Sequence, residues 1–446
     1  MDVFIMVSQL VVSLAILVVL HEAGHFLPAK WFKTRVEKFY LFFDPWFSLF
    51  KFKKGETEYG VGWLPLGGYV KISGMIDESM DKEQMKKPPQ PWEFRSKPAW
   101  QRLIIMLGGV FVNFILGFFI FAMLLFAYGE TYVPASSVDT GIYADSLGVE
   151  MGLQTGDHIL AIGDKPLERF SDRELIREVV INQADHITVE RDGRRMDIAI
   201  DERFVGIMSS SDFRNQRIFM ARFPFVVSQV VPDTPAEEAG LKPGDQIINF
   251  EGKSIRFYDE FSEMAGNYAG REVSIDIKRG DGSVISREIT LSEEGTIGVF
   301  PYGPEQFFDL SVREYGFFES LPAGVNQGMT FLTDQIKAFG QMFTGRIKAS
   351  ESLGGFGTIT NLFPSEWVWA DFWRVTAILS LILGFMNLLP IPALDGGHVM
   401  FLLWEVFTGK KPSDKFMEYA TIIGFLIVIL LVLYANGLDV MRWLGG

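Results

Sequence analysis

Four long apolar stretches constrain the fold of this 446-residue chain more than any other feature of its sequence. Each is about long enough to cross the hydrocarbon core of a bilayer, which takes roughly 20 apolar residues in a helix. We therefore predict a multi-pass α-helical membrane protein, embedded in a lipid bilayer. The stretches are residues 3–20, continuing as one helix to 25, then 103–128, 375–394 and 419–438. The predicted transmembrane helices are 1–28, 103–128, 373–394 and 417–438.

Charge is distributed unevenly between the segments that join these helices. Residues 29–102 carry 14 Lys and Arg against 9 Asp and Glu, and the loop 395–418 adds further lysines. Positive loops mark the cytoplasmic side of a membrane. Residues 129–374 carry 23 Lys and Arg against 39 Asp and Glu, a net charge of −16 in a chain of −14. We expect this acidic section on the opposite, outer side, and its charge argues against nucleic-acid binding.

The sequence His-Glu-Ala-Gly-His at positions 21–25 ends the first apolar stretch. On a helix, His21 and His25 share one face, which is the spacing that one zinc ion needs from two imidazoles. Glu22 lies next to them, placed to handle the proton of an attacking water. Ionisable residues at membrane depth are costly, which favours a functional role. Because the chain has no cysteine, thiolate ligands are excluded, and we predict a zinc hydrolase site that begins inside a membrane helix.

A catalytic zinc needs a third protein ligand, and the neighbouring residues do not supply one. An extended metzincin motif would have glycine at 28 and histidine at 31, where this chain has Pro28 and Trp31. Asp395, at the end of the third apolar stretch, lies roughly 30 Å along its helix, close to the roughly 27 Å of His21. His398 competes as the third ligand. Chemistry favours Asp395, because His398 begins a new apolar run.

Prolines and an asparagine surround the predicted third ligand. Pro390 and Pro392 are expected to break the helix before Asp395, which suits a cavity. Pro28 is likewise expected to loosen the first helix just after its histidines. Asn387 could hold a substrate carbonyl or a developing oxyanion, or form a hydrogen bond between helices.

The second apolar stretch has small and polar residues at a spacing of four. Gly109, Asn113 and Gly117 fall on one helix face, which suits close packing against a neighbouring helix. We expect Asn113 to have a packing role.

Residues 58–72 are apolar for a cytoplasmic-side loop. They are typical of two short strands around a Leu-Pro-Leu-Gly-Gly turn. This predicted β-hairpin either re-enters the membrane beside the site, where irregular backbone must contact protein or line a watery cavity, or lies on the surface.

The acidic section contains an internal repeat. The segment Gly-Leu-Gln-Thr-Gly-Asp at 152–157 matches Gly-Leu-Lys-Pro-Gly-Asp at 240–245, an offset of 88 residues. Both copies continue into a strand, a tight turn and a later hairpin. The pattern resembles PDZ domains, so we predict two tandem PDZ-like α+β domains outside the membrane, at 129–205 and 222–303, joined by a linker. They either bind extended peptide as an added strand or block access by bulk.

Residues 311–350 show one apolar stripe at helical spacing. This pattern predicts an amphipathic helix. It either lies on the outer membrane surface or packs on the second small domain.

Taken together, these motifs resemble the site-2 protease family of intramembrane zinc metalloproteases, of the RseP type (regulator of sigma-E protease). The resemblance covers nearly the whole chain in the family's order, although residues 78–98 and 203–221 carry no family signature. It implies one Zn²⁺ ion per chain, bound by His21, His25 and Asp395, with Glu22 as the catalytic acid and base. It also implies a re-entrant hairpin that binds substrate. The candidate substrate-binding residues are Asn387, Leu66, Gly67, Gly68 and Tyr69.

The predicted function is therefore intramembrane zinc endopeptidase, acting on transmembrane segments of single-pass proteins. By the resemblance, these include pre-trimmed anti-sigma factors and remnant signal peptides, in regulated intramembrane proteolysis at the bacterial inner membrane. The PDZ-like domains would lie on the periplasmic side, and the active site near the cytoplasmic side. Two other classes remain: a membrane scaffold with a structural metal, and a metal transporter. The sequence does not give the oligomeric state.

Overall fold

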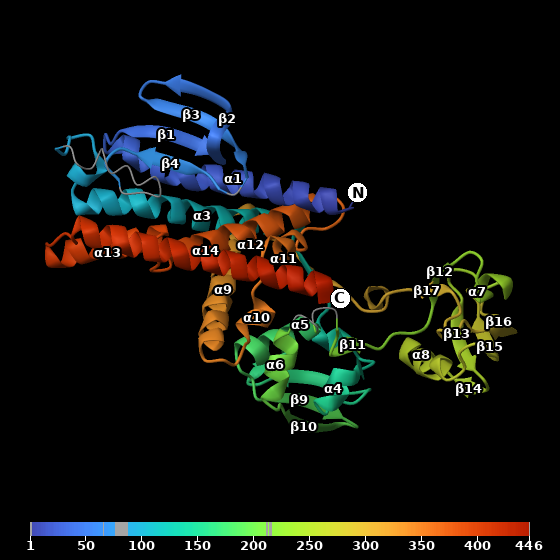
Figure 1. Cartoon of the computed structure of the whole chain (residues 1–446). Helices are drawn as coiled ribbons and strands as arrows, with labels where there is room; N and C mark the ends of the chain where they lie inside the picture. The colour runs from blue at the N-terminus through green and yellow to red at the C-terminus, as the bar shows by residue number, and fades with distance from the viewer. Residues whose placement is uncertain (1, 66, 76–87, 211–212, 214–215, 446) are drawn as a thin grey trace. The chain divides into compact units, whose positions relative to one another are not determined.

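The computed structural model describes residues 2–65, 67–75, 88–210, 213 and 216–445 (Figure 1). Two compact units divide the chain, and each is described by itself. The helical unit lies within Met1–Gly129, Glu314–Ile336 and Leu353–Gly446. The β-rich unit lies within Glu130–Arg313 and Lys337–Ser352.

Within the described residues, four helices of the helical unit have the length and apolar composition to cross a membrane, as the four apolar stretches predict. The helix of the third stretch ends at Leu388, six residues before its predicted end. Pro390 and Pro392 follow at once, which confirms the predicted break. A new helix, α13 (Asp395–Thr408), then begins at Asp395. The four long helices are α1 (Asp2–Trp31), α3 (Ala99–Tyr128), α12 (Trp369–Leu388) and α14 (Asp414–Gly445).

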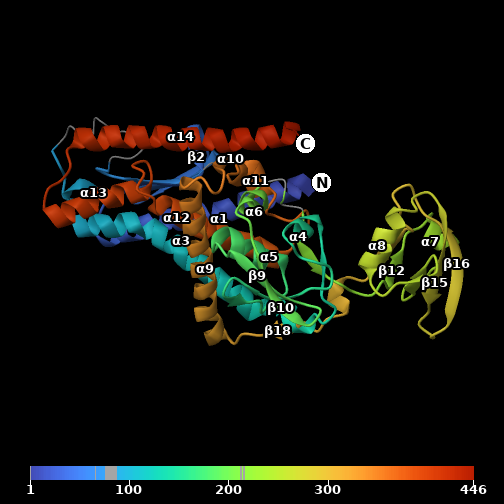
Figure 2. The same ribbon diagram turned by 90° about the horizontal axis from the view of Figure 1, so that it is seen from below.

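Helices α1, α12 and α13 all pack against α3, and Figure 2 shows α3 running along them. A Cβ atom on Gly24 of α1 would lie 2.7 Å from the carbonyl carbon of Gly108, so the two backbones touch. A Cβ atom on Gly117 would lie 2.7 Å from Cγ of Leu381 on α12, which confirms the close helix packing predicted for Gly117. The predicted loosening at Pro28 is wrong. The helix continues through Pro28 to Trp31. The carbonyl oxygen of Gly24, to which Pro28 cannot donate, faces Gly108 of α3.

A four-stranded sheet in the order β2-β3-β1-β4 fills the segment between α1 and α3. Strand β1 (Val36–Leu41) is antiparallel to β4 (Tyr69–Ile72) and parallel to β3 (Thr57–Leu64). Strand β2 (Phe43–Lys54) pairs with the outer side of β3. The two strands predicted within 58–72 therefore exist, but they do not form a hairpin, because β1 lies between them. This arrangement leaves β4 as an edge strand beside α1.

The β-rich unit contains two small domains, each with a four-stranded antiparallel sheet and its own apolar core. Strands β7 (His158–Ile162) and β8 (Lys165–Pro166) recur 88 residues later as β13 (Gln246–Phe250) and β14 (Lys253–Ser254), which confirms the predicted repeat. The sheets are completed by β9 (His186–Arg191) and β10 (Arg194–Ala199) in the first domain, and by β15 (Glu272–Lys278) and β16 (Val284–Thr290) in the second.

Part of the predicted linker at 203–221 belongs to the first small domain. Phe204 and Met208 of α6 lie in its core, and β11 (Phe219–Ala221) pairs with β6 (Ile142–Ala144). Short elements complete the unit: β5 (Glu130–Tyr132), α4 (Ser146–Glu150), α5 (Asp172–Ile176), the π-helix η3 (Arg177–Ile181), α6 (Arg203–Ser209), β12 (Val227–Val230), α7 (Pro235–Glu238), α8 (Tyr258–Gly266), β17 (Val299–Pro301) and β18 (Ser311–Arg313).

The predicted amphipathic helix is α9 (Phe317–Phe343). The expected packing on the second small domain is wrong, because the apolar core of that domain, as far as the structure describes it, contains no α9 residue, whereas a position on the outer membrane surface stays a prediction. In the helical unit α9 packs on α3, where a Cβ atom on Gly324 would lie 2.7 Å from Cβ of Ala122. Its last turns belong to the β-rich unit, where Lys337 donates to the side-chain carbonyl of Asn182 in the first small domain at 2.6 Å. Two short helices, α10 (Ala349–Ser352) and α11 (Phe356–Thr360), follow it.

Candidate metal centre

Two buried histidines of α1 face helix α3. His21 and His25 are 8% and 7% exposed, and their Nε2 atoms lie 3.2 Å apart. Gly109 of α3 lies against them. A Cβ atom there would overlap Nε2 of His25 and lie 2.7 Å from Cε1 of His21. Glycine at this position therefore leaves the space that the two imidazoles occupy.

The carboxylate of Asp395 completes a triangle of ligand atoms. Its Oδ2 lies 3.3 Å from Nε2 of His21 and 3.3 Å from Nε2 of His25. This oxygen is buried, and no group in the described part of the chain donates a hydrogen bond to it. Tetrahedral ligands placed about 2.05 Å from a common zinc ion lie roughly 3.3 Å apart. The three residues therefore fit one zinc ion.

The remaining ring nitrogens are held by α3. Nδ1 of His25 lies 2.8 Å from the carbonyl oxygen of Ile105, to which it donates. This bond leaves Nε2 unprotonated and free for a metal. Nδ1 of His21 lies 3.0 Å from the side-chain amide of Asn113. The amide oxygen of Asn113 has no partner among the described residues, so turning the amide by 180° lets it accept the His21 proton.

Glu22 lies between the histidines and the edge strand of the sheet. It lines the same cavity as Val70 of β4. A Cβ atom on Gly68 would lie 3.5 Å from Cγ of Glu22, so the loop before β4 also contacts this side chain. The strand and the loop before it therefore lie beside Glu22 and the candidate metal ligands.

A cavity of about 770 Å³ joins these groups. It is lined by the three ligand residues, by Glu22 and by β4, and Asn387 lines it as well. His398 also lines the cavity, but the ligand group that the structure brings together contains Asp395 instead. Of the hairpin candidates, Gly67, Gly68 and Tyr69 line the cavity, whereas Leu66 lies outside the described residues.

Polar contacts fix Tyr69 at the cavity wall. Its hydroxyl donates to Asp44 at 2.8 Å, and its ring stacks on Tyr40 and Phe43. Burial and the contact with Asp44 both raise the pKa of the Tyr69 hydroxyl, which therefore stays protonated.

Sequence reasoning missed two supports of this centre. The sequence predicts packing for Asn113 and helix contact for Gly109, yet both touch the candidate metal ligands. Their spacing of four residues on an apolar helix gave a signal, since it places both on the face toward α1. No sequence signal identifies the Ile105 carbonyl, because every residue has one.

Comparisons with known proteins cover nearly the whole chain. A family model described as Peptidase family M50 matches residues 9–431. The chain is 27% identical over 449 residues to the regulator of sigma-E protease RseP of Escherichia coli, covering 95% of this chain and 96% of that protein. It is 27% identical over 456 residues to a Treponema pallidum protein that carries the name of a zinc metalloprotease, covering 96% and 97%.

One solved structure overlaps part of the chain. The PDZ domain of an SdrC-like protein from Listeria innocua is 30% identical and covers 18% of this chain and 94% of that domain, with a TM-score of 0.16. At that score the overlap carries no weight for the fold.

Proposed function

The chain belongs to peptidase family M50, and on this premise we propose that it is a metalloprotease that hydrolyses peptide bonds inside the transmembrane segments of single-pass proteins. One zinc ion per chain would be held by His21, His25 and Asp395. The observation that carries the proposal is the triangle of their ligand atoms, with sides of 3.2 and 3.3 Å, beside Glu22. Two of these ligands come from a helix apolar enough to cross a membrane.

The residues of the chain divide the chemistry between them. The zinc ion that His21, His25 and Asp395 would hold would supply Lewis-acid chemistry at the scissile carbonyl. Glu22 takes a proton from the attacking water and later passes it to the leaving amine. Gly68 and Val70 lie beside Glu22, and Ile105 and Asn113 hold the imidazole rings. Groups fixed in this way need little reorganisation during the reaction.

A helical substrate must be unwound before cleavage, because its peptide groups are hydrogen-bonded within the helix. Strand β4 is an edge strand beside the catalytic residues, and an extended segment can pair with it. Asn387, Gly67, Gly68 and Tyr69 line the same cavity. We assign these residues, with the adjoining Leu66, to substrate binding.

The sheet that carries β4 would enter the membrane beside the site. Its outermost strand, β2, exposes large apolar side chains, with Trp46 91%, Leu49 66% and Phe50 60% exposed. Exposed apolar groups at this density are typical of a surface that contacts lipid or a partner. They support a re-entrant position rather than an ordinary surface sheet.

The acidic β-rich unit would lie on the periplasmic side of the inner membrane, as two PDZ-like domains. It would exclude or recognise substrates by the size or the new terminus of their outer part. Its charge and its two small domains support this role. Pre-trimmed anti-sigma factors and remnant signal peptides are the substrates that we propose, with cleavage near the cytoplasmic side.

The test is product analysis with a purified single-pass substrate. Wild-type protein should contain one zinc per chain and produce fragments cut within the transmembrane segment, as mass spectrometry identifies them. Glu22→Gln should keep the zinc and lose cleavage, because only the proton carrier is removed. Cleavage by the Glu22→Gln variant at the wild-type rate would contradict the assignment of Glu22. Zinc uptake by protein-containing vesicles, without cleavage, would instead indicate a transporter.

A further inference from the structure

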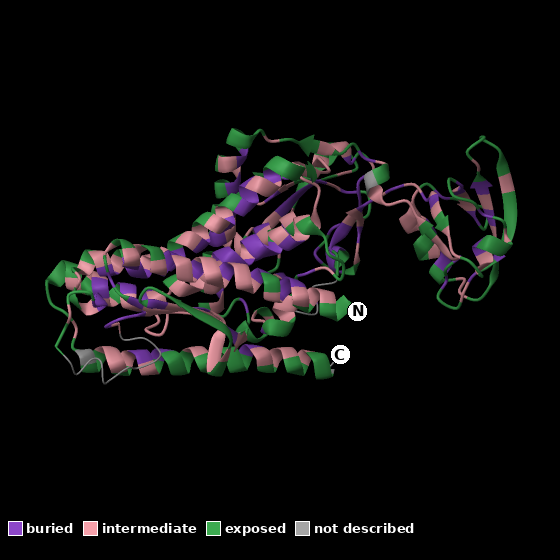
Figure 3. Ribbon diagram, turned by 90° about the horizontal axis from the view of Figure 1, so that it is seen from above, coloured by how far each residue is buried: buried purple, intermediate pink, exposed green. Residues whose placement is uncertain are grey.

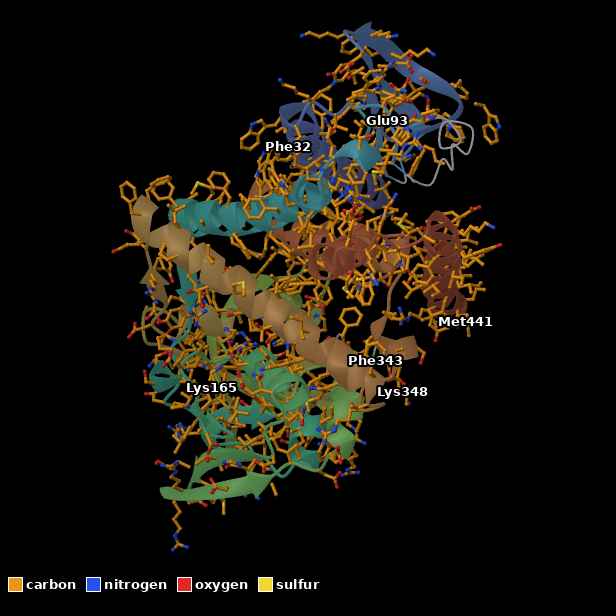
Figure 4. All side chains as sticks on the ribbon, turned by 90° about the vertical axis from the view of Figure 1, so that its left-hand side faces the viewer. Phe32, Glu93, Lys165, Phe343, Lys348 and Met441 are labelled. Atoms are coloured by element: carbon orange, nitrogen blue, oxygen red, sulfur yellow. The ribbon has the colours of Figure 1, made fainter. Side chains whose placement is uncertain are left out.

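Helix α14 contributes little to the protein interior. In its apolar window only 11% of the residues are buried, and Figure 3 shows exposed and half-exposed residues along most of its length. Met441, labelled in Figure 4, is 69% exposed. Thr421 is an exception at 8% exposed, and Gly424, one turn later on the same face, is also buried. A buried polar residue on a largely exposed helix calls for a partner.

The buried face of α14 contacts the loop that leads to the metal centre. A Cβ atom on Gly424 would lie 2.7 Å from the backbone nitrogen of Ala393 and 3.1 Å from that of Pro392. Residues 389–394 connect α12 to Asp395. Thr421 lines the same cavity as Glu22 and Asp395. Helix α14 therefore forms one wall of the catalytic cavity and presents a hydroxyl group there.

The hydroxyl of Thr421 differs from those of other helical threonines in this chain. Four of those donate to the carbonyl oxygen four residues earlier, at 2.7 or 2.8 Å: Thr333 to Met329, Thr360 to Phe356, Thr376 to Phe372 and Thr408 to Trp404. The hydroxyl of Thr421 is buried and has no hydrogen-bond partner in the part of the chain that the structure describes. An unpaired buried hydroxyl is destabilising, which is expected of a group kept available for a ligand.

We propose that Thr421 binds the substrate, by a hydrogen bond from its hydroxyl to a main-chain peptide group of the unwound segment. An unwound segment in an apolar environment exposes N–H and C=O groups that need partners. A hydroxyl can both donate and accept. Strand β4 supplies partners on one wall of the cavity, and Thr421 supplies one from α14. This inference rests on the proposed protease function and adds a binding residue to it.

The experiment compares Thr421→Val with Thr421→Ser in the full-length protein. Valine keeps the shape and removes the hydroxyl, whereas serine keeps the hydroxyl. We expect Thr421→Val to keep its zinc and to lose about 5- to 30-fold in kcat/KM, as for one lost hydrogen bond. Thr421→Ser should regain most of that loss. Thr408→Val is the matched control, because the Thr408 hydroxyl is exposed and bonded within its own helix, and it should cleave like wild type.

Two model substrates separate main-chain from side-chain recognition. One has only leucine and alanine around the cleaved bond, and the other has serine there. An equal loss with both supports a main-chain contact, whereas a loss confined to the serine substrate overturns it. Wild-type cleavage rates in Thr421→Val, or zinc loss in that variant, would also overturn the proposal. If wild type itself does not cleave, the protease function fails rather than the role of Thr421.

Discussion

The side-chain amide of Asn113 lies 3.0 Å from Nδ1 of His21. Asn113 is fully buried on α3, and its contact fixes which nitrogen of the His21 ring faces Asp395. A partner of this kind determines the tautomer and orientation of a metal-binding histidine. Helix α3 therefore supports the metal centre without contributing a ligand.

Removing this support should weaken metal binding. We expect Asn113→Leu to lower zinc affinity by about 10- to 100-fold, because the His21 ring loses its acceptor. Asn113→Asp keeps an oxygen acceptor and should stay near the wild-type affinity. Competition with a chelator measures both. Wild-type affinity in Asn113→Leu would show that the contact does not orient the ring.

The ligands themselves should differ in their contributions. We expect His21→Ala or His25→Ala to abolish bound zinc and Asp395→Ala to weaken it, since two imidazoles on one helix turn still bind a metal. Elemental analysis of the purified variants measures the bound metal. A full complement of zinc in His21→Ala would refute the ligand assignment.

Gly109 should tolerate no side chain. A Cβ atom there would overlap the His25 ring, so we expect Gly109→Ala to displace both imidazoles and lose most of the zinc. Gly437→Ala on α14 is the control, because no atom lies within 4 Å of its Cβ position. The zinc content of the two purified variants tests this. Equal zinc content would show that α1 and α3 can move apart without disturbing the metal centre.

The repeated segment ends in Asp157 in the first small domain and in Asp245 in the second. We expect the first domain to lose more stability than the second when this aspartate is removed. In the first, Arg191 contacts both oxygens of Asp157 at 2.7 and 2.8 Å. In the second, Nε of Arg279 lies 3.8 Å from Asp245. We expect Asp157→Ala to destabilise its domain by about 3 kcal/mol and Asp245→Ala by about 1 kcal/mol. Hydrogen exchange of the two sheets in the full-length protein measures this, and equal losses would contradict it.

Acid should destabilise the first small domain through Glu178. Burial opposes ionisation, but hydrogen bonds from Lys165 (Figure 4) and Asn182 outweigh it and lower the pKa of Glu178 below its usual 4.5. A lowered pKa in the folded state stabilises the domain above pH 4.5, and this contribution is lost as pH falls through the lowered value. Thermal melting of wild type and Glu178→Gln between pH 7 and 3 tests this. The difference between them should shrink on acidification, and a constant difference would contradict the argument.

Local patterns predicted much of this molecule. The spacing of His21 and His25, the break at Pro390 and Pro392, and the offset of 88 residues all depend on short-range chemistry, and the structure contains them. The matched depth of Asp395 on another helix was enough to place it near the histidines.

The contacts between segments far apart in the chain could not be predicted from local sequence patterns. The insertion of β1 between β3 and β4 depends on which strands meet in space, whereas a turn sequence shows only where a chain reverses. The position of α9 depends on Gly324 and Gly328, which let it approach α3 closely. An amphipathic stripe shows that a helix has an apolar face but does not identify its partner.

Helix α14 is anchored unevenly. Near its end, Asp439 accepts hydrogen bonds from the backbone and hydroxyl of Thr358 on α11, whereas Thr421 and Gly424 contact the catalytic wall closer to its start. Its apolar stretch, residues 419–438, is about 30 Å long and so matches an average hydrocarbon core, and a thinner or thicker bilayer would change the tilt of the helix. Acyl-chain length should therefore move the end of the helix that carries Thr421 relative to the Asp439 anchor, and with it that wall of the cavity. Turnover should rise and fall with the thickness of the host bilayer, while the zinc content stays constant.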